Sequence, residues 1–286
     1  MSCCGRSLVS LSLLLLLPVA HSDSVTALTN HGGRLLTGNL NVGILWYGPI
    51  PRAQRKAILS FFRSLNGPDS AGGKEPHVSS WWNIVASYQK GATKLAVKVV
   101  NQVSDENYSY GKVLIKDFIK PLLPKATGGN PHTLAVIIAS KGVTVQDMCA
   151  GSCAQHGLID AQYYVAVGDP EEECPECAWP FLASHGKVGK TLLPPSGNVG
   201  ADSMVKLLAG GLAGAVTNPF GDAFYATGHG DHLLEATSTC PDIFSSGKLL
   251  VDSQNGGSYN AVGDDGIKFL LPPIWNPKTS TCWTPL

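Results

Sequence analysis

Apolar runs alternate with amphipathic segments along much of the chain, and each pattern predicts one kind of element. Residues 40–47 (LNVGILWY) form a short apolar run that ends at Gly48-Pro49, which predicts a buried strand. In residues 51–65, apolar side chains recur at the spacing of one helical face, which predicts a helix that begins at Pro51. The same reasoning predicts helices at residues 79–89, 112–123 and 202–216, and strands at residues 95–103, 134–139 and 163–167. This alternation predicts a mixed α/β fold.

The C-terminal part of the chain follows a different pattern. From Gly221 onward turn signals dominate, and the clearest strand pattern covers residues 248–252. The helix predicted at residues 202–216 contains three glycines, each of which should weaken it by about 1 kcal/mol relative to alanine. These glycines therefore predict very close packing against another element. No repeat or linker divides the chain, so we expect one α/β domain over residues 23–286 with a loop-rich C-terminal half.

The first 22 residues have the pattern of a secretory signal peptide. Arg6 supplies a positive start, and residues 8–17 form an apolar run of about ten residues, too short to span a bilayer as a helix. Ala20 and Ser22 are small residues in the positions that a signal peptidase requires for cleavage before Asp23. We therefore expect a secreted chain. No later stretch reaches about 18 unbroken apolar residues, so we expect no membrane span.

Six cysteines remain after the predicted cleavage. An even number of cysteines in an oxidising compartment predicts disulfides. Four lie close together, so we expect two bridges among them and a third bridge that ties the C-terminal tail to the body. The alternative is a structural zinc site, because C-x₃-C and C-x₂-C resemble ligand pairs; the leader peptide favours disulfides. The six are Cys149, Cys153, Cys174, Cys177, Cys240 and Cys282.

Composition limits the classes of partner. The 286 residues include 21 basic and 21 acidic side chains, and only 15% are charged, against a usual ~25%. A nucleic-acid-binding protein would need a basic excess, so we expect no nucleic-acid partner. Cleavage removes one basic residue, Arg6, and the mature chain stays near neutral, so adhesion to acidic polymers by charge alone is not expected. Asn107-Tyr108-Ser109 is an acceptable glycosylation sequon in a polar stretch.

Familiar catalytic motifs are missing from the sequence. It contains no G-x-S-x-G, no complete phosphate-binding loop, no G-x-G-x-x-G after a strand and no H-E-x-x-H. We therefore predict no cofactor. Four histidines are candidate metal ligands, although hydrogen-bonded or solvated loop histidines explain them more simply: His156 and His185 near the cysteine pairs, and His229 and His232 in the segment GHGDH.

Two further residue types could serve a site. A glycosidase needs two carboxylates about 5–9 Å apart, and six are candidates: Asp202, Asp222, Glu235, Asp252, Asp264 and Asp265. Tryptophans can form a sugar-stacking platform, although core packing explains them equally well; the six are Trp46, Trp81, Trp82, Trp179, Trp275 and Trp283.

Sequence blocks over nearly the whole mature chain resemble the plant EXORDIUM / phosphate-induced protein 1 family. They include GGRLLTGNLNVGILWYG (32–48), CAGSCAQHG (149–157), CPECAWPF (174–181), LAGAVTNPFGDAFY (212–225) and a C-terminal block from GKLLVDSQNGG to STCW, in the order of the family. The resemblance implies a protein of the apoplast or cell wall that is connected with growth and cell expansion, including brassinosteroid-responsive growth. It implies no enzymatic activity.

Distant microbial relatives of this family carry a helix that reads H-E-x-x-E-A-V-T-D-P, which is similar to a zinc peptidase helix. At the corresponding positions of metal ligands and general base, this chain has Gly210, Gly211 and Gly214. Glycine can neither ligate zinc nor move a proton. The comparison predicts a distantly zincin-like scaffold whose site is lost, unless this helix lies away from any cleft.

Three functions are consistent with these observations. The first is a non-catalytic extracellular protein that binds cell-wall polysaccharide or a surface protein. The second is a hydrolase that acts on wall polysaccharide or peptide through an unidentified site. The third is a metal protein that uses the candidate histidines. The missing catalytic motifs favour the first.

Overall fold

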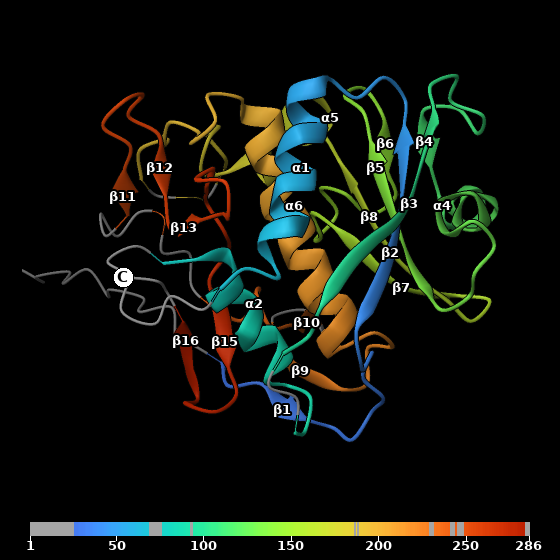
Figure 1. Ribbon diagram of the computed structural model, residues 1–286, viewed down its shortest axis with the longest axis horizontal. Helices are drawn as coiled ribbons and strands as arrows, with labels where there is room; N and C mark the ends of the chain where they lie inside the picture. Colours follow the sequence, from blue (N-terminus) through green and yellow to red (C-terminus); the bar gives the residue numbers. More distant parts are fainter. Residues whose placement is uncertain are drawn as a thin grey trace, which may run out of the picture.

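A computed structural model (Figure 1) describes residues 26–68, 76–91, 94–185, 187, 189–228, 232–240, 244 and 249–283. The predicted leader peptide and His229 lie outside these residues.

A five-stranded sheet forms the centre of the fold. Its strand order is β3-β2-β5-β8-β7. The first four strands run parallel, and β7 lies antiparallel to β8 at one edge. The strands are β2 (Leu40–Tyr47), β3 (Val97–Asp105), β5 (Thr133–Ala139), β7 (Gln155–Ile159) and β8 (Gln162–Gly168). Every residue of β5 is buried, which explains why the sequence shows a continuous apolar run there.

The two faces of the sheet belong to two separate cores. Along β2, Val42, Ile44 and Trp46 face one core, while Leu45 and Tyr47 face the other. This alternation follows from the two-residue period of a strand. Both sets are fully or almost fully buried, so β2 requires cover on both faces.

Helices supply this cover (Figure 1). The helices α1 (Arg52–Ser64) and α6 (Val199–Thr217) pack on one face, and α4 (Leu123–Thr127) packs on the other. Beyond α1 and α6 lie α2 (Val78–Ala86) and the short C-terminal strands, as Figure 1 shows. Contacts of α6 with the sheet on one side and with β14 (Lys268–Phe269) on the other leave it mostly buried.

The remaining elements are short. The three-stranded sheet contains β1 (Thr29–Asn30), β9 (Phe224–Thr227) and β10 (Leu233–Leu234). Two-stranded pairs are β4 (Val113–Leu114) with β6 (Thr144–Val145), β11 (Leu250–Val251) with β12 (Ser258–Tyr259), β13 (Ala261–Val262) with β14, and β15 (Ile274–Asn276) with β16 (Thr281–Trp283). The short helices are α3 (Lys116–Ile119), η1 (Lys120–Leu122), α5 (Pro170–Glu173) and η2 (Pro175–Ala178).

The predicted mixed α/β fold is confirmed, with two differences in detail. The helix predicted at residues 112–123 is wrong in part, because the segment starts with β4 and its helices are short. Pro121 and Pro124 lack the backbone N–H that a continuous helix needs. The strand β7 was not predicted, because its sequence begins with Gln155-His156-Gly157 and lacks an apolar pattern.

The predicted close packing of α6 is confirmed at two of its three glycines. A Cβ at Gly211 would lie 2.8 Å from Val165 Cγ1 of β8, and one at Gly214 would overlap His156 of β7. At Gly210 the nearest atom is 3.4 Å away. In the described part of the chain, α6 is the one helix long and apolar enough to cross a membrane by length and composition. Its burial between two layers accounts for that composition.

The first turn of α6 contains a buried carboxyl group. Asn198 caps the helix by accepting from Ala201 N at 2.8 Å. Asp202 is 4% exposed, and its Oδ2 accepts from the backbone N and from the hydroxyl of Ser196, each at 2.8 Å. Burial raises the pKa of Asp202 to about 6, although the bonds from Ser196 partly offset this effect.

We predict that Asp202→Asn flattens the dependence of stability on pH between about 4 and 7. A raised pKa in the folded state favours folding at low pH, and this contribution is lost as pH rises through about 6. A shift of about two units corresponds to roughly 3 kcal/mol. Thermal unfolding at several pH values measures the effect, with the exposed Asp117→Asn as matched control. Parallel curves for wild type and Asp202→Asn would contradict the prediction.

Candidate functional site

A polar cavity of about 340 Å³ lies at the β7 edge of the sheet. The strands β7 and β8, the segment between β6 and β7, the start of α3, and Glu235 just after β10 form its walls. The lining residues are Lys116, Gln146, Asp147, Ser152, Ala154, Gln155, His156, Tyr164 and Glu235. Most of them offer hydrogen-bonding groups, so the cavity suits a polar ligand.

His156 and Glu235 form a hydrogen-bonded pair in this cavity. His156 Nε2 lies 2.8 Å from Glu235 Oε2, and Asn218 Nδ2 donates to Glu235 Oε1 at 2.8 Å. Asn218 is itself held at the end of α6, because its Oδ1 accepts from Ala223 N at 2.9 Å. The side chains of His156 and Glu235 are 14% and 23% exposed, so water weakens this chain of bonds only in part.

Glu235 is ionised near neutral pH. Burial acts to raise its pKa, but the hydrogen bonds from His156 and Asn218 and the charge of His156 outweigh burial and lower the pKa below its ordinary value. An ionised carboxylate can only accept hydrogen bonds. The pair therefore places a proton on His156 Nε2.

A glycine of α6 makes room for the imidazole. A Cβ at Gly214 would lie 2.6 Å from His156 Cδ2 and closer still to Nε2. Real Cβ atoms do not approach other atoms so closely, so a methyl group at this position would have to displace the imidazole that is hydrogen-bonded to Glu235. Gly214 thus lets α6 and β7 hold His156 against Glu235.

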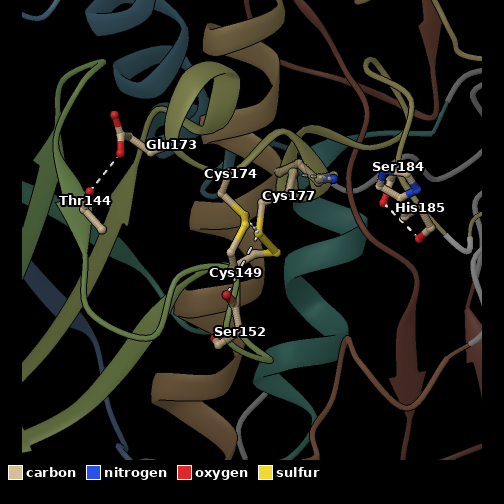
Figure 2. The surroundings of a disulfide bond; sticks show 10 residues. Thr144, Cys149, Ser152, Glu173, Cys174, Cys177, Ser184 and His185 are labelled. Atoms are coloured by element: carbon tan, nitrogen blue, oxygen red, sulfur yellow. Dashed lines mark hydrogen bonds between the residues drawn. A yellow bond between two sulfur atoms is a disulfide. The ribbon is translucent and has the colours of Figure 1, made fainter.

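Two disulfides fix the segment before β7, which forms one cavity wall. Cys149 pairs with Cys174, and Cys153 pairs with Cys177, beside α6 (Figure 2). Both bridges tie this wall to α5 and η2. Asp147 and Cys149 adopt φ values of 60° and 68°, so the wall turns sharply just before the cavity.

The structure contains the three predicted bridges. The third joins Cys240 to Cys282. The zinc alternative for the cysteines is therefore wrong. In the part of the chain that the structure describes, the one group of three close metal-ligand candidates is Cys149, Cys174 and Cys177, and all three sulfurs are in disulfides.

The structure does not gather the candidate histidines into one site. His156 lies in the cavity, whereas His185 is exposed and lies away from the sulfurs in Figure 2. His232 is exposed, and its ring lies next to Gly151 of the cysteine-rich segment. His229 lies outside the described residues.

The candidate carboxylates are dispersed, and only Glu235 lines the cavity. Asp252 pairs with Lys268, and Asp265 pairs with Arg63 of α1. The cavity contains a second carboxylate, Asp147, which the sequence analysis did not single out. No motif marks it; only its place two residues before Cys149 could have drawn attention to it.

The tryptophan platform is not supported by five of its six members. They are 5% exposed or less and belong to the hydrophobic clusters of the fold: Trp46, Trp81, Trp82, Trp179 and Trp275. A buried indole cannot present a face to a sugar. Trp283 is partly exposed at the end of β16 and does not line the cavity.

Comparison with known proteins gives consistent matches over almost the full chain. The family model described as the phosphate-induced protein 1 conserved region matches residues 28–285. Protein EXORDIUM-like 2 of Arabidopsis thaliana is 40% identical over 272 residues, which cover 89% of this chain and 88% of that protein. Protein EXORDIUM of the same plant is 38% identical over 278 residues (89% and 88%). Protein PHOSPHATE-INDUCED 1 of Nicotiana tabacum is 36% identical over 275 residues (89% and 87%).

No solved structure matches the chain. The zincin-like part of the fold prediction therefore has no support from a structural relative.

We predict opposite effects for two alanine substitutions in α6. Gly214→Ala should lower the free energy of unfolding by about 1–3 kcal/mol, because the new methyl group displaces His156. Gly210→Ala meets only Thr237 Oγ1 at 3.4 Å and should be neutral or stabilise the fold by up to about 1 kcal/mol. Urea unfolding of both variants measures the difference. Equal free energies of unfolding for the two variants would show that the position of His156 does not depend on a glycine at residue 214.

Proposed function

Because this chain belongs to the phosphate-induced protein 1 family, we propose that it is a secreted plant protein of the apoplast and cell wall, connected with growth and cell expansion of the brassinosteroid-responsive type. It acts by binding a wall component, without catalysis. The polar cavity around His156 and Glu235 is the observation on which the binding role rests.

Three features support secretion. The leader pattern of residues 1–22 directs a chain to the secretory route. The three disulfides are typical of proteins that mature in an oxidising compartment. Asn107 is exposed in the turn after β3, where an oligosaccharide could be attached without disturbing the core.

The positions of the carboxylates support binding rather than catalysis. Of the six candidates only Glu235 lines the cavity, and both of its oxygens already accept hydrogen bonds from the protein. The alternative, a wall hydrolase, has one observation in its favour, because Asp147 and Glu235 line the same cavity. A hydrolase of polysaccharides would use such a pair as acid and base or nucleophile.

The glycines of α6 support a second proposal, which concerns the evolutionary origin of the fold. Gly211 and Gly214 face β8 and β7 beside the cavity, so this helix does not lie away from a cleft. This position is consistent with a zincin-like scaffold in which the glycines at positions 210, 211 and 214 replace a lost metal site.

We predict that plant cells expressing the full chain release a glycosylated protein that begins at Asp23. The leader should be cleaved, and removal of N-linked sugar should increase gel mobility. Asn107→Gln should abolish the mobility change, whereas Asn130→Gln, at an exposed asparagine outside any sequon, should not. N-terminal sequencing and glycosidase treatment provide the measurement. A full-length chain retained inside the cell would refute the secretion proposal.

We also predict that the mature protein is retained by at least one wall polysaccharide and releases no product from it. A pull-down against insoluble wall fractions, followed by chromatography of the soluble sugars, tests both parts. Products that disappear in Glu235→Gln or Asp147→Asn would replace the binding proposal with the hydrolase. If the protein is not retained by any wall fraction and releases no products, both the binding proposal and the hydrolase alternative are contradicted.

A further inference from the structure

The two disulfides beside the cavity lie in contact with each other. Cys174 Sγ, which is bonded to Cys149, lies 3.2 Å from Cys177 Sγ, which is bonded to Cys153. Within the described chain, the sulfurs of Cys149, Cys174 and Cys177 all lie within 4.8 Å of one another, and Figure 2 shows them gathered beside α6. A sulfur released from one bridge would therefore already touch the other bridge.

Each bridge joins a more exposed cysteine to a buried one. Cys149 is exposed and Cys153 is half-buried, whereas Cys174 and Cys177 are only 0% and 2% exposed. A dissolved thiol therefore meets the first bridge on the side of Cys149. Attack on Cys149 Sγ releases Cys174 as a thiolate, and this thiolate forms next to Cys177.

The backbone already brings together the cysteines that would form the alternative pairs. Cys177 N donates to the carbonyl oxygen of Cys174 at 2.9 Å, so one turn holds these two residues. Cys149 N donates to the carbonyl oxygen of Ser152 at 3.1 Å, so the other segment folds back on itself just before Cys153. Disulfides need close Cα atoms, and both alternative pairs therefore require little movement of the backbone.

We propose that these four cysteines form a thiol-responsive exchange site, in which a small thiol that attacks Cys149 causes the two bridges to exchange partners. The thiolate of the small molecule bonds to Cys149 Sγ and releases the thiolate of Cys174. Cys174 then bonds to Cys177 Sγ and releases the thiolate of Cys153. Finally, Cys153 bonds to Cys149 Sγ and releases the small thiol. Two disulfides are present before and after, so the exchange consumes no oxidant or reductant.

The exchange changes what the bridges connect. The observed bridges tie residues 149–153, which belong to a cavity wall, to the segment of α5 and η2. After the exchange, Cys149–Cys153 and Cys174–Cys177 each close within one segment, so the wall loses its covalent connection to that segment. The proposal goes beyond the binding role above and depends on neither the ligand nor the cell wall.

Brief treatment of the folded mature protein with glutathione, followed by quenching with N-ethylmaleimide in denaturant, tests the proposal. Cleavage after Asp160 and Glu176 then separates the cysteine-rich peptides for mass spectrometry without reduction. In chains with one glutathione and one maleimide, we expect glutathione on Cys149, maleimide on Cys153 and a bridge between Cys174 and Cys177. Chains that have completed the exchange should have neither label, and the peptide that contains Cys149 and Cys153 should be released from the others.

The position of the maleimide decides the outcome. Maleimide on Cys174, with Cys153–Cys177 intact, would show that the first bridge opens without exchange and would overturn the proposal. Absence of both the Cys149 adduct and the exchanged bridges would overturn it as well. This measurement uses the wild-type chain, so it does not depend on the folding of a variant.

A pair of double variants provides the matched comparison. Cys153→Ser together with Cys177→Ser removes the second bridge, so maleimide should move to Cys174 and glutathione should stay on Cys149. Cys240→Ser together with Cys282→Ser removes the third bridge, which belongs to no group of three close sulfurs in the described chain. This second variant should exchange like wild type, and a loss of exchange in it would contradict a role confined to the four cysteines.

Discussion

The close approach of α6 to the strands β7 and β8 is the constraint on which the site depends. Gly211 and Gly214 remove the side chains that would separate the helix from the sheet. The end of α6 then places Asn218 beside Glu235, and β7 places His156 against the same carboxylate. Side chains from β7, from the end of α6 and from the segment after β10 thus meet in one hydrogen-bonded chain.

A similar contact stabilises the far side of the sheet. A Cβ at Gly43 would collide with the backbone of Ala126 in α4, so β2 and α4 also approach more closely than ordinary side chains permit. The register of β2 with β3 shifts between Val42 and Gly43, at the same place. Both faces of the sheet therefore use glycine to bring a helix close.

Much of the framework could be predicted from the sequence, because the buried side chains of a strand or helix recur at a regular spacing. The strand β2 matches residues 40–47, and α1 and α6 match their predictions within a few residues, since their apolar faces recur at regular spacing. The strand β7 could not be predicted, because Gln155 and His156 serve the cavity instead of the core. The pairing of His156 with Glu235 spans 79 residues and leaves no local pattern. Glu235 was one of six candidate carboxylates, and only the fold distinguishes it from the other five.

The two disulfides beside the cavity hold the chain together if the backbone between them is cut. Cys149–Cys174 and Cys153–Cys177 interleave, so every peptide bond between Cys153 and Cys174 lies inside both covalent loops. The exposed tip of the β7–β8 hairpin, at Asp160 and Ala161, has positive φ values and is an accessible place for a protease to cut. A single cut there leaves both fragments covalently joined on either side of the cavity. The residues around the cavity therefore stay covalently connected after such a cut.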